Sequence, residues 1–358
     1  MTKATQAPAC GYSADTEILT RHQGWVTFDQ LTCFDEVATR SPEGRFEWQH
    51  PERVSRERHE DEMVRFYGRS MDLLVTPGQR VLWSPDPRTP ERGSPASTIL
   101  ERVPRLTRVR ASAYFRPTST WDAPELAEKV FPGTRRSKMG PKPRDVRMTG
   151  DQFAAFMGMY IAEGSATPAA NGNFIIAIAQ SPGGKGYDEY RCLLTDLLGH
   201  EPGCTGHAWA FRSQAVYAYL RPLGKAASKW LPEEVRNLSR RQLGIFWQYY
   251  FLGDGSYERH AEAAHSVAAA TASPILAGQL QEIIQKLGWV SSARKYQYKP
   301  TALVPRSGPV YKLRIRKAAM PSCGVVGMPY SGMVGNVKVP NGAIYVRRAG
   351  HPAWCGAI

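Results

Sequence analysis

Two stretches of similar sequence decide the fold: FMGMYIAEG at residues 156–164 and WQYYFLGDG at residues 247–255. Each is a mainly apolar run that ends in one acidic residue, Glu163 or Asp254, and a glycine follows the acid at once. An apolar run closed by glycine is typical of a buried helix with a glycine stop. The sequence therefore predicts two helices, each ending in a carboxylate.

The two helices belong to an internal repeat. A predicted strand begins eleven residues after the acid in each copy, at Phe174 in the first and at His265 in the second. A second predicted helix then closes at a glycine, 36 residues after the acid in the first copy and 34 in the second. This layout of alternating helices and strands predicts an α+β domain, with repeats at about 148–222 and 240–317.

Small residues indicate how the two acidic helices pack. Gly158 and Ala162 lie four residues apart on one helix face, which allows a second helix to approach closely. Tyr249 and Gly253 occupy the same places in the second copy.

Helices packed in this way would bring the two acids together at their C-terminal ends. The helix dipoles and the mutual repulsion disfavour Glu163 and Asp254 there as a pair of anions. A divalent cation relieves the repulsion, and Mg²⁺ is the hard ion that prefers oxygen ligands. For one copy alone, a solubilising helix end explains the acid equally well.

Both stretches resemble the two motifs of the LAGLIDADG homing endonucleases, over about 170 residues that include residues 223–232. The resemblance implies a monomer with pseudo-twofold symmetry, in which each half lays a curved antiparallel sheet in the major groove of a long, asymmetric double-stranded DNA site. It implies Mg²⁺-dependent phosphodiester hydrolysis, with Mn²⁺ as a substitute. The implied catalytic and metal-binding acids are Glu163 and Asp254, with Ala162 and Gly253 as further metal ligands.

Two other residues bear on this resemblance. Tyr249 departs from the small residue usual at its place, which predicts looser or tilted helix packing. Lys312, in a predicted strand at residues 310–315, is a candidate for the basic residue that such sites place near the scissile phosphate. An ordinary strand lysine on the DNA face or in solvent explains Lys312 as well.

The net charge of +14, in a chain with only 22% charged residues, indicates a polyanionic partner. Nucleic acid is the first candidate, and a solvated basic surface is the alternative. The Pro-rich segment 131–147 concentrates positive charge against the single acid Asp145, and is either a DNA-contacting arm or an exposed linker. Its basic residues are Arg135, Arg136, Lys138, Lys142, Arg144 and Arg147.

Both ends of the chain show a different pattern, of short strands and turns. The N-terminal end predicts strands at residues 16–19, 25–28, 62–67 and 73–83, and the C-terminal end at 334–339 and 343–348 around a turn at 340–342. A β domain that begins at one end and is completed at the other is explained by a domain inserted into its middle.

Three segments of these ends resemble inteins and related Hint domains: residues 10–19, 75–83 and 337–358. The resemblance covers about 130 residues. It implies a two-domain chain: an all-β, horseshoe-like Hint splicing domain formed by both chain ends, and the inserted α+β endonuclease domain.

The resemblance also implies a reaction. Cys10 would attack the carbonyl of Ala9 to form a thioester, and Thr76 with its motif partner would polarise or twist that peptide bond. Residues 1–9 would then be a remnant of a covalently flanking host protein. Taken alone, Cys10 would be explained as an ordinary thiol near a terminus. The ten residues that follow it favour the splicing role.

Four departures from the intein pattern predict impaired or blocked splicing. Gln79 stands where histidine is usual, and Asn336 stands where a catalytic aspartate or cysteine is common. Ala357 takes the place of the cyclising asparagine, and Ile358 that of the downstream nucleophile. Glutamine cannot shuttle a proton near neutral pH and alanine cannot cyclise. The splicing element is either degenerate or deliberately silenced.

These patterns divide the chain into five parts: a host remnant at 1–9, the N-terminal splicing part at 10–110, the basic linker or arm at 111–147, the endonuclease at 148–322 and the C-terminal splicing part at 323–358.

Six cysteines without C-x-x-C spacing argue against a zinc site or disulfide framework, and we expect most of them, Cys10 excepted, in the core. Without a long apolar run we expect no membrane partner and a cytoplasmic location, in a prokaryotic or phage context.

Two alternative functions remain open from the sequence. One is a free-standing LAGLIDADG endonuclease or DNA-binding regulator, in which the β-rich ends are an accessory DNA-binding module. The other is an autoprocessing Hint element whose inserted nuclease is inactive.

Overall fold

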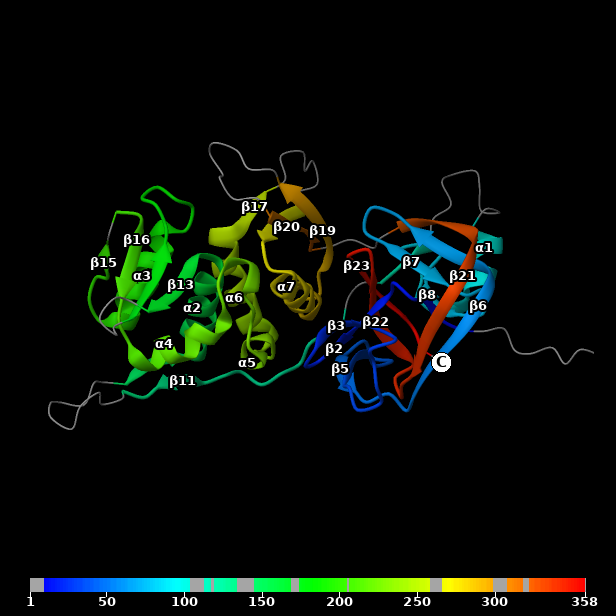
Figure 1. Cartoon of the computed structure of the whole chain (residues 1–358), viewed down its shortest axis with the longest axis horizontal. Coiled ribbons are helices and arrows are strands. Elements are labelled where there is room, and N and C mark those ends of the chain that lie inside the picture. The colour runs from blue at the N-terminus through cyan, green and yellow to red at the C-terminus, as the bar shows by residue number, and fades with distance from the viewer. Residues whose placement is uncertain are drawn as a thin grey trace, which may run out of the picture. The chain divides into compact units, whose positions relative to one another are not determined.

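The chain forms two compact units (Figure 1), and the computed structural model describes residues 10–103, 113–116, 119–133, 145–168, 174–204, 206–257, 266–298, 308–317 and 322–357. The first unit comprises Met1–Trp121, Ile284–Arg294 and Arg314–Ile358, and the second Asp122–Ile283 and Lys295–Leu313. In the described part of the chain, no helix is long and apolar enough to cross a membrane.

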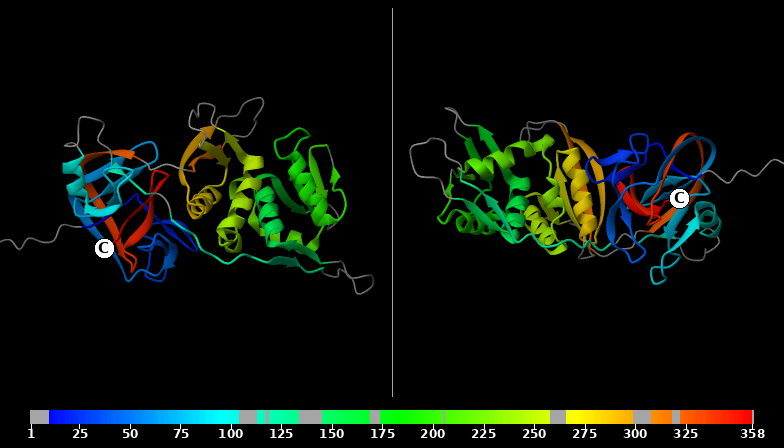
Figure 2. Two further views of the ribbon diagram at one scale, coloured as in Figure 1. Left: turned by 180° about the vertical axis from the view of Figure 1, so that it is seen from behind. Right: turned by 90° about the horizontal axis from the view of Figure 1, so that it is seen from below.

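A long two-stranded ribbon dominates the first unit. Its strands, β6 (Arg53–Tyr67) and β21 (Ser322–Lys338), pair antiparallel from Arg53↔Lys338 to Tyr67↔Gly324 and lie side by side in Figures 1 and 2. The ribbon belongs to a five-stranded sheet of order β1-β7-β6-β21-β10, in which β1 also pairs with β21. Its other strands are β1 (Tyr12–Ser13), β7 (Asp72–Val75) and β10 (Ala113–Tyr114).

A six-stranded sheet completes this unit, in the order β23-β22-β2-β4-β5 with β3 beside β2, and β8 and β9 form a small separate sheet. The strands are β2 (Glu17–Thr20), β3 (Gly24–Thr27), β4 (Val37–Arg40), β5 (Phe46–Gln49), β8 (Arg80–Trp83), β9 (Arg92–Pro95), β22 (Ala343–Arg348) and β23 (His351–Gly356), and helix α1 (Ala96–Arg102) follows β9. Strands from both chain ends therefore share both larger sheets, as expected for a β unit begun at one end and completed at the other.

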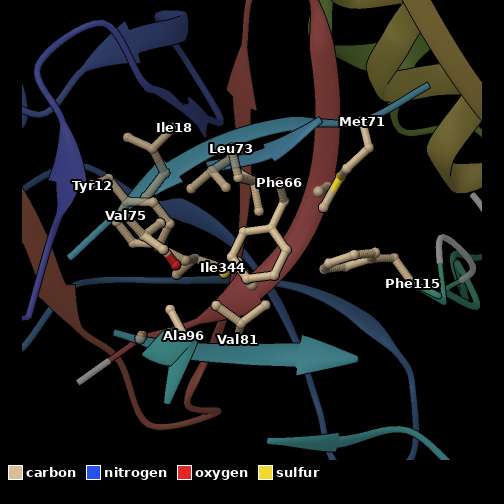
Figure 3. Close-up of a cluster of buried hydrophobic side chains, with 14 of the residues drawn as sticks. Tyr12, Ile18, Phe66, Met71, Leu73, Val75, Val81, Ala96, Phe115 and Ile344 are labelled. Atoms are coloured by element: carbon tan, nitrogen blue, oxygen red, sulfur yellow. The ribbon is translucent and has the colours of Figure 1, made fainter. Parts of the chain in front are cut away.

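The core of this unit draws on both ends of the chain. Figure 3 shows Tyr12, Phe66, Leu73, Val81 and Ile344 meeting in one buried cluster. Burying one such side chain contributes about 1.5–3 kcal/mol. The cluster therefore ties the C-terminal strands to the N-terminal ones.

Three predicted strands differ from the observed ones. The segment 73–83 is two strands, β7 and β8, because Pro77 and Gly78 form a turn in which the Gln79 amide donates to Thr76 O at 3.0 Å. The strand predicted at 62–67 begins already at Arg53, and the strand predicted at 334–339 begins at Ser322. Charged, exposed residues in the first part of β6 and glycines in the first part of β21 leave no apolar alternation that would predict a strand there.

The second unit contains most of the repeat, and parts of α7, β19 and β20 are assigned to the first unit. Helix α2 (Gly150–Glu163) leads into the sheet β13-β14-β16-β15, and helix α6 (Arg240–Asp254) leads into the sheet β17-β18-β20-β19. These strands are β13 (Gly164–Pro168), β14 (Phe174–Ala179), β15 (Gly203–Cys204), β16 (Ala208–Phe211), β17 (Gly255–Tyr257), β18 (Ser266–Thr271), β19 (Val290–Tyr298) and β20 (Gly308–Arg316). The remaining α-helices are α3 (Tyr187–Leu198), α4 (Gln214–Leu220), α5 (Glu233–Arg236) and α7 (Pro274–Lys286).

Helices α2 and α6 begin alike. Thr149 caps α2 and Ser239 caps α6, each accepting a hydrogen bond from the backbone N–H of the glutamine three residues later. Both helices end where the sequence predicts, at the acid. Yet Gly164 and Gly255 are extended rather than left-handed, with φ of −85° and −88°, so the chain passes directly into a strand.

Glycine is required at both positions because any larger residue would clash with a side chain of the preceding helix turn. A Cβ at Gly164 would lie 2.2 Å from Cδ2 of Tyr160, and one at Gly255 would lie 2.1 Å from Cδ2 of Phe251. Left-handed glycines do follow α3 and α7, at Gly199 with φ of 72° and near the helix end at Gly288 with φ of 79°.

The described ends of the predicted arm form a small hairpin sheet. Strand β11 (Glu128–Phe131) pairs with β12 (Val146–Thr149), and Arg147 forms ion pairs with Glu128 and Asp145 at 3.0 and 3.7 Å. The other basic residues of the arm lie outside the described residues.

The cysteines correct one expectation from the sequence. Cys323 and Cys355 are buried, as predicted, but Cys33, Cys192 and Cys204 are exposed and Cys10 is half-buried. The three exposed cysteines lie on a turn, a helix surface and an edge strand, where the surrounding residues show no apolar pattern. The residue type alone therefore gave a wrong prediction of burial.

Candidate active sites in the two units

Helices α2 and α6 touch along their backbones. A Cβ at Gly158 would lie 2.3 Å from Phe246 O, so no larger residue fits there without a shift. The looser packing predicted from Tyr249 is not observed, because the Tyr249 ring stacks on Tyr190 with centroids 6.2 Å apart instead of separating the helices. The Tyr190 hydroxyl also donates to Tyr249 O at 2.7 Å.

This close approach brings the two acids together. A Cβ at Gly253 would lie 2.6 Å from Ala162 Cβ, 2.9 Å from Glu163 Cγ and 3.0 Å from Glu163 Oε1. Glu163 and Asp254 are half-buried, and each ends its helix. The site residues expected from the two motifs thus converge.

Burial makes both acids hard to ionise, and two nearby lysines offset this effect only in part. Burial and then the charge of Glu163 raise the pKa of Asp254 to about 7, against the attraction of Lys229 and Lys185. Burial also raises the pKa of Glu163, which the same two lysines oppose.

Lys229 closes the end of α2. Its Nζ donates to the carbonyls of Tyr160, Ile161 and Gly164 at 3.0, 2.8 and 2.9 Å. Burial lowers the pKa of Lys229 to about 8, although Asp254 and Glu163 oppose this shift. The buried ammonium satisfies carbonyls that the helix end leaves open.

Lys185 closes the end of α6 in the same way. Its Nζ donates to Phe251 O, and to Gly255 O at 2.7 Å. Burial lowers the pKa of Lys185, opposed by Asp254 and Glu163. One lysine therefore caps each acidic helix, and both lie in the field of the two acids.

Neither lysine was predicted from the sequence as a site residue. Lys229 lies in the stretch 223–232 that contributes to the LAGLIDADG resemblance, which was its one signal. Lys312, the basic residue singled out instead, lies half-buried in β20. Its role at the scissile phosphate stays a prediction.

The donor set at the acids fits an oxygen-loving cation. In the described part of the chain, no three His, Cys, Asp or Glu side chains gather as a metal cluster. The protein thus offers two carboxylates, and the backbone carbonyls of Ala162 and Gly253 directly precede them in the sequence. Mg²⁺ suits such a site because it keeps several waters and takes further ligands from phosphate.

A second group of site residues meets at the joined chain ends. The Asn336 side-chain amide donates to Cys10 O at 3.2 Å and to Gln79 Oε1 at 2.7 Å. Gln79 Nε2 in turn donates to Gly356 O at 2.6 Å, and the Tyr12 hydroxyl donates to the same carbonyl. A continuous chain of hydrogen bonds thus links residues 346 positions apart in the sequence.

Thr76 holds the residue after Cys10. Its Oγ1 accepts from the Gly11 amide at 2.9 Å, and its own amide donates to Gly11 O at 2.9 Å. Ala357 is buried, and its amide donates to Gly342 O at 3.0 Å. Residues 1–9 and Ile358 lie outside the described residues.

The thiol of Cys10 is not activated by its surroundings. Burial and then the negative charge of Glu57 raise its pKa. Tyr12, buried with a raised pKa caused chiefly by its burial, and Glu57 are two neighbours that the sequence reasoning did not single out.

Comparison with known proteins identifies part of the chain. Residues 241–317, which begin in α6 and include the second four-stranded sheet, match the LAGLIDADG-like domain. Residues 241–317 are therefore similar to the LAGLIDADG-like domain. No curated protein matches the chain.

Solved structures show two kinds of similarity. Mesophilic variants of the homing endonuclease I-DmoI are 15% identical, covering 46% of this chain and 88% of theirs with a TM-score of 0.31. I-DmoI in complex with DNA and Mn is 15% identical, covering 46% and 89% with a TM-score of 0.31. AceL NrdHF, a class 3 split intein in a glutathione-linked, splice-inactive variant, is 14% identical, covering 46% and 95% with a TM-score of 0.24.

Proposed function

We propose that this chain is an intein containing a LAGLIDADG homing endonuclease that cuts double-stranded DNA at a long, asymmetric site. The observation that supports the nuclease function is the close approach of Glu163 and Asp254 at the ends of two helices that pack through glycine. A DNA-binding protein without catalysis gains nothing from two anions aimed at phosphate.

A divalent cation held by Glu163 and Asp254, Mg²⁺ with Mn²⁺ as a substitute, would supply Lewis-acid stabilisation of the phosphate and activation of the attacking water. Two glycines and two lysines of the chain would position the carboxylates and the positive charge of that site. The close contacts of Gly158 and Gly253 fix the separation of the two carboxylates. Lys185 and Lys229 hold the helix ends and keep positive charge beside the position of the phosphate.

A cleavage selection tests the nuclease. The full chain is incubated with Mg²⁺ and a plasmid library carrying random inserts, and linear products are sequenced. We expect one recurrent site, and no enrichment with the double variant Glu163→Gln/Asp254→Asn. Enrichment by the double variant would contradict the assignment of the acids, and no recurrent site with the unchanged chain would favour a Hint element with an inactive nuclease.

The hydrogen-bond chain from Cys10 to Gly356 supports the splicing half. It links Cys10, Asn336 and Gln79 to Gly356, which precedes Ala357, and Thr76 hydrogen-bonds to Gly11 next to Cys10. Ala357 still lacks a side chain that can cyclise, so release of the C-terminus and splicing are blocked. Thioester formation at the Ala9 peptide bond stays open, and addition of a strong thiol is expected to release residues 1–9.

A further inference from the structure

The two faces of the sheet in the first repeat differ in what covers them. Ile176, Ile178 and Trp209 are buried on one face. Phe211 pairs with Ile176 on that face and contacts Phe156 of α2, with ring centroids 6.4 Å apart. The residues between them along each strand project from the other face and are half-buried or exposed. One face is therefore packed on the helices, and the other is accessible.

The accessible face carries small and apolar side chains. Ser165 of β13, Ala177 of β14 and Ala210 of β16 pair in one row across the sheet, and Thr167 and Ile175 pair in the next. The four strands of this sheet contain no charged residue, although the net charge of the chain is +14. The groups that this face presents are thus mainly methyl groups.

The matching strand of the second repeat has a different accessible face. Strands β16 and β20 are each third in the order of their sheet. Leu313 and Ile315 of β20 are buried, so the residues that alternate with them, Lys312, Arg314 and Arg316, project from the opposite face. The same place in the two repeats therefore presents methyl groups in one and cationic groups in the other.

Both sheets start at the proposed cleavage site. Strand β13 begins at Gly164, directly after Glu163, and β17 begins at Gly255, directly after Asp254. A duplex with a phosphate at these acids would run beside the strands that leave them. The major groove is about 12 Å wide and admits a β-ribbon, and thymine is the base that presents a methyl group there.

We propose that the first repeat recognises its half of the DNA site through thymine methyl groups in the major groove, whereas the second repeat binds the other half through cationic side chains; this rests on the proposed nuclease function. The small side chains of the first sheet let its strands approach the base edges, and apolar contact with a thymine methyl group removes both surfaces from water. A face without charge adds sequence preference, whereas the cationic face adds salt-dependent affinity.

Uracil tests this inference because it is thymine without the methyl group and keeps the same hydrogen bonds. The DNA site recovered by the cleavage selection is divided at the cut, and all thymines of one half at a time are replaced by uracil. Affinity of the full chain is measured by gel shift in Ca²⁺. We expect the replacement to weaken binding in one half by about 4-fold for each contacted methyl group, and to leave it unchanged in the other half.

A double variant links the effect to the accessible face of the first sheet. Ile175→Thr/Ala177→Ser replaces apolar groups of β14 by hydroxyls, and the ratio of affinities for thymine and uracil DNA should fall toward 1. Ile275→Thr/Ala127→Ser is the matched control, since both residues are exposed and lie outside the sheets, and its ratio should equal that of the unchanged chain. Each ratio is measured within one protein, so a loss of folded protein does not alter it.

The outcomes separate this inference from the proposed function. Equal affinity for thymine and uracil DNA in both halves overturns the inference and leaves the nuclease intact. An unchanged ratio in Ile175→Thr/Ala177→Ser also overturns it, because the methyl groups are then read by another surface. No recurrent site in the cleavage selection overturns the proposed nuclease, and this inference with it.

Discussion

At the scale of single residues, the two acids of the second unit carry the proposed catalysis. Glu163→Gln or Asp254→Asn removes one charge with almost no change in size. We expect either change to lower Mg²⁺-dependent cleavage of the selected site by at least about 100-fold, because each carboxylate holds the cation. DNA affinity, measured by gel shift in Ca²⁺, should be largely unchanged. An undiminished cleavage rate in either variant would show that the active site lies elsewhere.

The raised pKa of Asp254 predicts how pH acts on metal binding and stability. An ordinary aspartate titrates near 4, whereas Asp254 titrates at about 7. In metal-free protein its contribution to stability is thus full below about pH 4 and is lost as the pH rises through about 7. A cation binds the ionised form, so the stabilisation by Mn²⁺ should grow over the same interval.

Thermal melting checks both parts of this prediction. The increase in Tm on adding Mn²⁺ should be larger at pH 8 than at pH 5.5, and small at both in Asp254→Asn. Without metal, Asp254→Asn should melt above the unchanged protein at pH 8, because a poorly solvated charge is gone, and the difference should shrink at pH 5.5. A Mn²⁺ effect independent of pH would contradict the assigned metal site.

At the scale of the elements, features that depend only on residues close together in the chain could be predicted from the sequence. The ends of α2 and α6, the strands after them and the later helix stops follow from apolar runs, acids and glycines at fixed spacings. The lysine caps did not follow, because Lys229 and Lys185 reach carbonyls 65 or more residues away in the chain. Pro77 is a sequence signal for the turn that divides β7 from β8. The apolar residues on both sides of it nevertheless led to the prediction of one continuous strand.

The contact between α2 and α6 gives a prediction at this scale, with a control in the same helix pair. Gly158→Ala places a Cβ 2.3 Å from Phe246 O and should destabilise the protein by about 1–3 kcal/mol, as overpacking does. Gly244 lies in α6 with nothing near its Cβ position, so Gly244→Ala should stabilise by about 0.5–1 kcal/mol. Chemical denaturation measures both. Equal effects of the two changes would mean that the helices do not meet at Gly158.

At the scale of the whole molecule, the net charge of +14 predicts DNA binding that weakens steeply with salt. Each lysine or arginine on a phosphate releases counterions, and six to ten such contacts cost about 10³–10⁵ in affinity between 50 and 200 mM salt. Fluorescence anisotropy with the selected duplex measures this slope. An affinity that hardly changes over that range would show that the positive charge serves another purpose.

The proposed splicing function of the first unit gives the last prediction, because Cys10 and Gly356, the neighbour of Ala357, are at opposite ends of one hydrogen-bond chain. Cys10 and Thr76 have the side chains that the proposed reaction needs, whereas Ala357 cannot form a succinimide and Ile358 cannot accept an acyl group. In a chain with longer segments added at both ends, Ala357→Asn with Ile358→Cys should restore C-terminal cleavage or ligation, seen as new bands by electrophoresis. Further changes of Gln79→His and Asn336→Asp should raise the rate, since both return a titratable group to the site. The same segments around the unchanged residues are the control and should give no C-terminal product. If the fourfold variant neither cleaves nor ligates, the joined ends are not a splicing site, and a free-standing nuclease with an accessory β unit becomes the better account.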